Sequence, residues 1–160
     1  MLLDNYTQFL DSIFQKLAEL RIDVSKYELD HFGYQTSSDA DYDFLKPEFE
    51  RPGEFFSEET VGGRRVGVLI FSKPLQYKDY KIPAMELVAP KAKQVCPSSL
   101  EHVEFVLTEG FEDFMKKYPE IKFDVSAINQ PMFPMLKLTV DKNIQVKFHL
   151  KPVLEIVVEN

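Results

Sequence analysis

The chain has 160 residues, of which 44% are hydrophobic and 13% aromatic, so it can bury a core and is not a disordered protein. Its net charge of −7 argues against general nucleic-acid binding, which needs a cationic face to replace phosphate counterions. No apolar run reaches the ~18 residues of a membrane span, and the first residues do not resemble a signal peptide. We therefore expect a cytoplasmic protein without a membrane partner. The single cysteine, Cys96, cannot form an internal disulfide.

Residues 3–20 are predicted to form an amphipathic helix. Apolar side chains recur at the i, i+3, i+4, i+7 spacing of a helix, while the opposite face is acidic and polar. The apolar positions are Leu3, Tyr6, Phe9, Leu10, Ile13, Phe14, Leu17 and Leu20. We expect this helix to pack on a sheet and to carry no chemistry, with binding to a partner protein as the alternative.

Residues 25–90 are predicted to form a first β-α-β-β-β module. A helix over 39–50, with Asp39 or Asp41 as its N-cap, follows an alternating, aromatic-rich strand. Gly62-Gly63 predicts a tight hairpin. Pro83 predicts that the last strand starts late or lies at a sheet edge. The strands are expected at 29–36, 55–60, 65–71 and 80–88.

The same order of elements recurs after a proline-containing linker at 91–99. A helix marked by Phe111, Phe114, Met115 and Tyr118 is predicted to end before Pro119. The apolar tail at 153–158 has no clear element type. Strands of this second module, residues 100–160, are expected at 100–107, 123–128, 135–140 and 144–151.

These elements predict an α+β fold. Tandem β-α-β-β-β modules would form a shared curved-sheet cavity, preceded by an extra N-terminal helix. The whole chain, 1–160, would be a single domain, with residues 1–24 as an N-terminal helical extension.

The three histidines all lie in strand-like runs. His31 and His102 follow Leu-Asp and Leu-Glu at the starts of the two modules, and His149 lies on the last strand of the second. Its counterpart on the last strand of the first module is Glu86. Each of these residues alone would be read as an ordinary core or surface residue, but their joint placement in a duplicated pattern favours one site.

Three imidazoles and one carboxylate suit a divalent Zn, Ni, Co, Mn or Fe(II) ion. Four protein ligands leave two positions on an octahedral ion. These positions could hold both oxygens of a diol, hydroxyketone or enediolate, which the ion would polarise as a Lewis acid. A fully tetrahedral zinc site would instead be closed and structural.

Two further side chains share strand faces with these histidines, because faces alternate with period two. Glu104 shares the face of His102 and is our candidate general base, with an exposed charge as the alternative. Lys147 shares the face of His149 and is our candidate for neutralising an anionic substrate, with a solvated lysine as the alternative. Arg64 and Arg65, beside Gly62-Gly63, could reach an anion, but we favour a solvated turn.

Several segments resemble the bacterial YecM-like branch of the vicinal oxygen chelate superfamily, which includes glyoxalase I, extradiol dioxygenases and methylmalonyl-CoA epimerase. The resemblance implies a paired-module fold and a metal site at His31, Glu86, His102 and His149. In glyoxalase I the last ligand is usually a carboxylate, and the dioxygenases use two histidines and one carboxylate, so neither mechanism transfers directly. The segments are Asp30-His31, Met85-Glu86-Leu87, Leu100-Glu101-His102-Val103-Glu104, Val146-Lys147-Phe148-His149 and Glu155-Ile156-Val157.

Three functions fit this pattern. The preferred one is a metal-dependent isomerase, epimerase or lyase that acts on a small, oxygen-chelating and in some cases anionic molecule. The second is a metal-dependent dioxygenase, and the third is a non-catalytic protein that binds a small ligand or a metal. A monomer and a homodimer are both compatible with the sequence.

Overall fold

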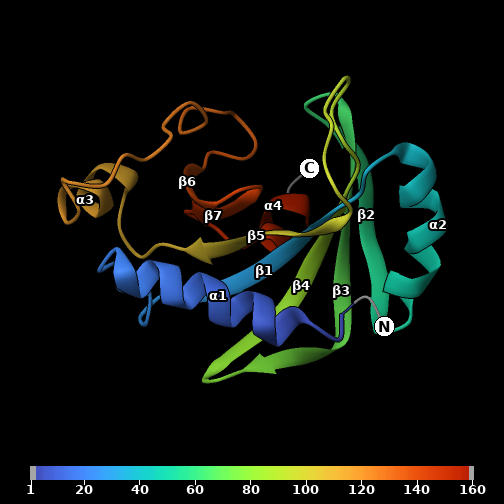
Figure 1. Ribbon diagram of the computed structural model, residues 1–160, viewed down its shortest axis with the longest axis horizontal. Coiled ribbons are helices and arrows are strands. Elements are labelled where there is room, and N and C mark those ends of the chain that lie inside the picture. The colour runs from blue at the N-terminus through green and yellow to red at the C-terminus, as the bar shows by residue number, and fades with distance from the viewer. Residues whose placement is uncertain (1–2, 159–160) are drawn as a thin grey trace. The chain divides into compact units, whose positions relative to one another are not determined.

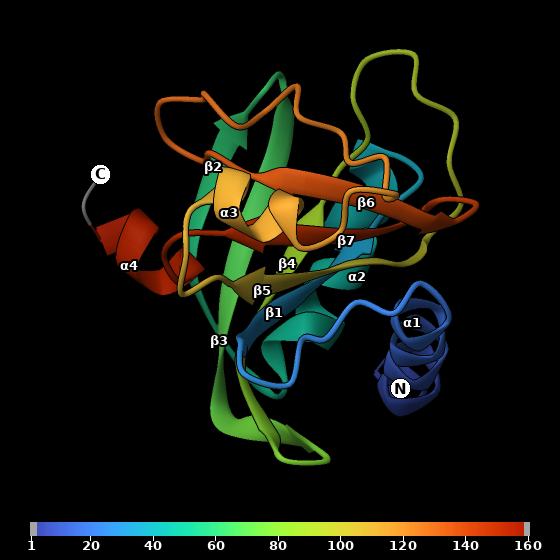
Figure 2. The same cartoon turned by 90° about the vertical axis from the view of Figure 1, so that its left-hand side faces the viewer.

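Residues 3–158, the part of the chain described by the computed structural model, contain four helices and seven strands (Figures 1 and 2). The elements are α1 (Tyr6–Glu19), β1 (Glu28–Gln35), α2 (Asp39–Glu50), β2 (Gly53–Val61), β3 (Arg64–Tyr77), β4 (Tyr80–Val88), β5 (Ser99–Val106), α3 (Phe111–Lys116), β6 (Leu136–Asp141), β7 (Ile144–His149) and α4 (Val153–Val158). The predicted α+β class is confirmed. None of the described helices is long and apolar enough to cross a membrane.

The chain divides into two compact units, each built from two stretches of sequence. Unit 1 contains residues 3–6 and 31–101, and unit 2 contains residues 7–30 and 102–158. Most of α1 therefore belongs with the second half of the chain. Its buried face carries Leu10, Ile13 and Leu17, as the helical spacing predicts, and Phe14 meets Phe105 with 6.0 Å between ring centroids.

The strands of unit 1 lie in the order β2-β3-β4-β1. β4 pairs antiparallel with β3 and parallel with β1, so the first and last strands of the module are neighbours. The predicted hairpin joins β2 and β3 at Gly62 and Gly63, whose φ values of 59° and 80° lie in the left-handed region that favours glycine.

The prediction that Pro83 delays β4 or places it at a sheet edge is wrong. β4 starts at Tyr80 and lies between β3 and β1. Pairing with β1 begins only at Ala84. On the other side, the register with β3 shifts between Ile70 and Leu75, opposite Pro83. A proline is tolerated here because no neighbouring strand needs its missing N–H.

Helix α2 has the predicted bounds, but its N-cap is Ser38 rather than Asp39 or Asp41. The Ser38 hydroxyl accepts a hydrogen bond from the Asp41 N–H, which satisfies one of the unpaired donors of the first turn. Tyr42, Leu45 and Phe49 form the buried face, and the Phe49 ring lies 5.1 Å from that of Tyr34 on β1.

The strands of unit 2 lie in the order β5-β7-β6, with β7 parallel to β5 and antiparallel to β6 (Figure 2). The predicted strand at 123–128 is wrong, because this segment makes only an isolated bridge between Asp124 and Lys137. The Asp124 carboxylate accepts a hydrogen bond from the Ser126 N–H, a local turn that competes with strand pairing. The apolar tail forms the short helix α4.

Phe114 of α3 lies at the centre of an aromatic core in unit 2. Its ring centroid is 4.6 Å from that of Phe148, 5.2 Å from Tyr118, 5.7 Å from Phe123 and 5.8 Å from Tyr27. Burial of these rings holds α3 against β7.

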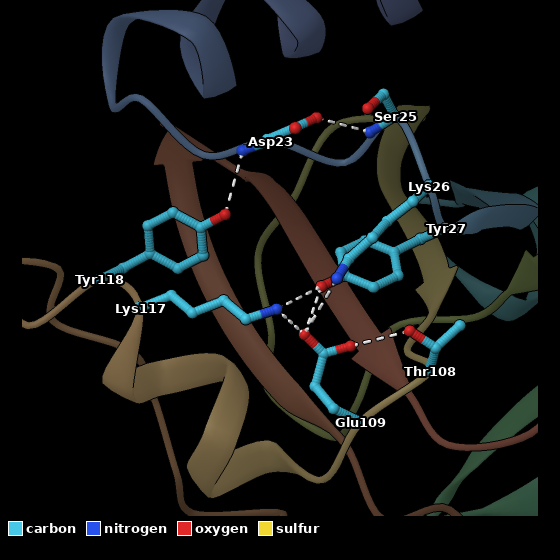
Figure 3. Close-up of polar contacts among 8 residues, drawn as sticks. All are labelled: Asp23, Ser25, Lys26, Tyr27, Thr108, Glu109, Lys117 and Tyr118. Atoms are coloured by element: carbon cyan, nitrogen blue, oxygen red, sulfur yellow. Dashed lines mark hydrogen bonds and ion pairs between the residues drawn. The ribbon is translucent and has the colours of Figure 1, made fainter.

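A polar cluster at Glu109 joins the segment before β1 to α3 (Figure 3). The Tyr27 hydroxyl donates to the Glu109 carboxylate at 2.6 Å, Thr108 donates at 3.0 Å, and the Lys117 ammonium contacts the same carboxylate. Burial alone would raise the pKa of Glu109, but hydrogen bonds from Lys117, Tyr27 and Thr108 outweigh it and lower the pKa to about 2.

This cluster predicts an acid-labile contribution to stability. The pKa of Glu109 falls from 4.5 to about 2 on folding, so its stabilising effect is complete above about pH 5 and is lost as the pH falls toward 2. The difference in free energy of unfolding between wild type and Glu109→Gln should therefore be constant near neutrality and shrink in acid. Urea unfolding at a series of pH values measures it, with Glu112→Gln on the exposed side of α3 as the charge-matched control. A pH-independent difference would contradict the prediction.

Candidate metal centre

Glu104 is the central side chain of the candidate site in unit 2. It lies on β5 two residues after His102, on the same strand face, and is in register with Lys147 of β7. Its Oε1 is 3.8 Å from His102 Nε2 and 3.6 Å from Lys147 Nζ. Its Oε2 contacts Nε2 of His149. One carboxylate thus contacts two imidazoles and an ammonium.

All four of these residues are buried, with exposed fractions of 0% for His102, 2% for Glu104, 6% for Lys147 and 2% for His149. The alternatives of an exposed Glu104 and a solvated Lys147 at a sheet edge are therefore wrong. A carboxylate is held at such a depth only with compensating partners. Lys147 supplies the opposite charge, and the imidazoles supply nitrogen atoms that can donate or bind a metal.

Unit 1 holds the other two predicted ligands. His31 lies on β1 and Glu86 on β4, and the parallel register pairs His31 with Ala84 and Gly33 with Glu86. His31 Nε2 is 3.7 Å from Glu86 Oε1. The histidine is fully buried, and 12% of the glutamate side chain is exposed. The structure therefore brings His31 to Glu86 within unit 1, and His102 to His149 through Glu104 within unit 2.

Parallel pairing explains why each unit gathers its own ligands. In both units the first strand pairs with the last, β1 with β4 and β5 with β7. Residues far apart in sequence thereby come to adjacent strands. This adjacency is a property of the strand register, which the sequence pattern alone does not determine.

The distances suit metal ligation within each unit. Two ligand atoms bound to one ion at about 2.1 Å are at most ~4.2 Å apart. The separations of 3.7 Å between His31 and Glu86 and of 3.8 Å between His102 and Glu104 satisfy that limit. Imidazole nitrogen with carboxylate oxygen is the donor set of Zn, Ni, Co, Mn and Fe(II) sites. The residues present therefore fit a divalent transition metal.

Glu104, predicted from sequence as a base, also lies at ligand distance from His102. The signal was present in the His102-Val103-Glu104 triplet, which points two donors to one face of a strand. The neighbouring Asp30 has a structural role, because its carboxylate accepts the Val153 N–H at 2.8 Å and holds the start of α4.

The sequence profile of the YecM family, described as "YecM protein", matches residues 1–159. The chain belongs to the YecM family. An uncharacterised protein of Haemophilus influenzae is 25% identical over 122 residues, which cover 76% of this chain and 61% of that relative. The match thus spans less than two thirds of the relative's length.

Solved structures show the same fold. A protein determined by structural genomics superposes with a TM-score of 0.79 at 23% identity, covering 99% of this chain and 91% of the other. Methylmalonyl-CoA epimerase of Streptomyces coelicolor, in complex with 2-nitronate-propionyl-CoA, gives a TM-score of 0.53 at 15% identity, covering 76% of this chain and 92% of the epimerase. This YecM-family protein therefore has the vicinal oxygen chelate fold.

The buried charge pair of unit 2 predicts strong coupling between Glu104 and Lys147. Removing either partner leaves the other charge buried, so Lys147→Met and Glu104→Gln should each cost about 3 kcal/mol. The double variant should cost less than the sum by at least about 1 kcal/mol. Urea unfolding in EDTA, which removes any effect of metal, measures the coupling.

Lys137 provides the matched control for this experiment. It lies directly across from Lys147 on β6 and pairs with the half-exposed Asp124 at 3.3 Å. Because that ion pair is solvent-screened, Lys137→Met should cost less than about 1 kcal/mol. Additive effects of Glu104 and Lys147 would contradict the coupling.

Proposed function

We propose that this protein is a metal-dependent enzyme of the isomerase, epimerase or lyase type that chelates adjacent oxygens of a small molecule. The observation that carries the proposal is the buried contact set of unit 2. There the Glu104 carboxylate touches His102, His149 and Lys147. A site of two imidazoles, a carboxylate and an ammonium at this depth is typical of a functional centre rather than of a hydrophobic core.

The proposal assigns His31, Glu86, His102 and His149 as ligands of one divalent ion. Its support is the duplicated placement of these residues on the first and last strand of each module, together with the superfamily resemblance. Each unit also holds a donor pair at ligand-compatible distance, His31 with Glu86 and His102 with Glu104. Glu104 is a further ligand whenever it is not acting as a base.

The chain's own residues supply the proton chemistry. A bound divalent ion would polarise the substrate oxygens as a Lewis acid. The Glu104 carboxylate would take a proton from the carbon beside the polarised oxygen and return it at the next carbon, as in an isomerase. The Lys147 ammonium, 3.6 Å from Glu104, would offset the negative charge that develops on the substrate.

Metal content tests the proposal. After EDTA treatment and dialysis, the full chain should take up about one Zn, Co, Ni or Mn ion, as measured by elemental analysis. His102→Ala and His149→Ala should lose stoichiometric metal while keeping the circular dichroism spectrum of the wild type. Glu155→Gln, an exposed carboxylate on α4, is the control and should retain the ion.

The pH dependence of metal binding is a second readout of the same site. Imidazoles must be neutral to bind, so affinity should fall steeply below about pH 6. A chain that takes up no metal, or histidine variants that keep it, would contradict the proposed function. Metal uptake without turnover of any hydroxy or oxo acid would favour the non-catalytic alternative, and oxygen consumption only with Fe(II) would favour the dioxygenase.

A further inference from the structure

The adjacent arginines at the start of β3 have different surroundings. The charge of Arg65 is paired within unit 1, because its guanidinium lies 2.8 Å from Asp43 and 3.0 Å from Glu58. The same guanidinium lies 4.1 Å from the centre of the Tyr42 ring. Arg64 instead donates from Nη1 to the neutral side-chain oxygen of Gln35 at 3.2 Å. Among the residues that the structure describes, no carboxylate forms an ion pair with Arg64.

Gln35 holds Arg64 in a defined orientation. Its side chain is only 3% exposed, and its Nε2 donates both to the Thr36 carbonyl at 3.1 Å and to the Val88 carbonyl at 3.2 Å. Because the amide nitrogen faces these two acceptors, the amide oxygen must face Arg64. Gln35 thus positions the guanidinium without neutralising it, and most of its five donors stay available for an anion.

Strand register places Arg64 on the sheet face that carries His31 and Glu86. Antiparallel pairing joins Val68 with Glu86 and Val66 with Val88, so Arg64, two residues before Val66, follows on the same face. On β1, Gln35 lies four residues after His31 and therefore also shares that face.

The same register gives the position along the strands of Gln35, which holds Arg64, relative to Glu86. Gln35 pairs with Val88, and Gly33 pairs with Glu86. The amide that holds Arg64 is therefore one two-residue step, about 7 Å, along the strands from the level of Glu86. A molecule of four or five carbons spans such a distance.

We infer that Arg64, positioned by Gln35, binds a carboxylate of the substrate on the sheet face that carries the Glu86 donor. The substrate would then be an anionic hydroxy or oxo acid, with vicinal oxygens at one end and a free carboxylate at the other. This inference rests on the proposed function, and it replaces the solvated turn that the Gly62-Gly63 hairpin suggested for Arg64.

The positive charge of Arg64 also acts on the Cys96 thiol at this end of unit 1. Burial and the nearby charge of Glu101 both raise the pKa of the Cys96 thiol, whereas Arg64 lowers it. A bidentate substrate carboxylate would give Arg64 its missing anionic partner.

Calorimetric titration of the full chain loaded with Co(II) tests the inference, using two probes that chelate in the same way. 2-Hydroxyglutarate carries a distal carboxylate, and 2-hydroxypentanoate carries a methyl group in its place. We expect the first to bind at least about tenfold more tightly, the effect of a charge-assisted hydrogen bond. Arg64→Gln should abolish that preference and leave the bound cobalt unchanged. Arg65→Gln, the neighbouring arginine, should retain it.

The outcomes separate this inference from the proposed function. Equal affinity for the two probes, or a preference that survives Arg64→Gln in cobalt-loaded protein, would overturn the role of Arg64 and leave the metal site standing. If the chain takes up no cobalt, the proposed function fails, and titration of the metal-free chain with glutarate decides the anion site. If glutarate binds the wild type and not Arg64→Gln, the anion site is supported. If glutarate does not bind, or binds both equally, the anion site is overturned.

Discussion

Burial of the Glu104 carboxylate is the constraint on which the arrangement of unit 2 depends. An isolated carboxylate at 2% exposure would be strongly destabilised, so its neighbours must compensate it. Parallel pairing of β5 and β7 provides those neighbours by placing Lys147 beside Glu104 and bringing His149 to the end of the same face. Hydrophobic residues of similar size would stabilise the fold at least as well as this buried ion pair. The presence of the polar set therefore indicates a functional role rather than a purely structural one.

Unit 1 has the same parallel pairing of its first and last strands, with fewer polar residues on them. Its first and last strands, β1 and β4, are parallel neighbours, and they bring His31 to Glu86. The difference between the units is one of charge. Lys147 compensates the carboxylate of unit 2, whereas the described cation on the corresponding face of unit 1 is Arg64, held further along the strands by Gln35.

Local features of the sequence predicted much of the fold. Helix 39–50 and the Gly62-Gly63 hairpin depend on side-chain periodicity and on glycine conformation, both of which act over a few residues. Pro83 and the segment at 123–128 were misjudged because their structures depend on distant partners. A bulge in β3 makes room for the proline, and the Asp124 turn limits pairing with β6 to a single bridge.

The candidate site was predictable to the extent that strand alternation determines it. Alternation predicts that Glu104 shares a strand face with His102, and Lys147 with His149. The register between the two strands depends on tertiary packing and cannot be read from alternation. The direct contact of Glu104 with Lys147 therefore emerged only from the structure, as did the role of Gln35 in orienting Arg64.

X-ray absorption at the edge of bound zinc or cobalt tests the central claim, that buried imidazoles and carboxylates hold a metal ion, most directly. The account predicts a first shell of nitrogen and oxygen at about 2.0–2.2 Å, with outer-shell scattering from at least two imidazoles. His149→Ala should weaken the imidazole scattering. A spectrum without imidazole scattering, or one unchanged in that variant, would contradict the account.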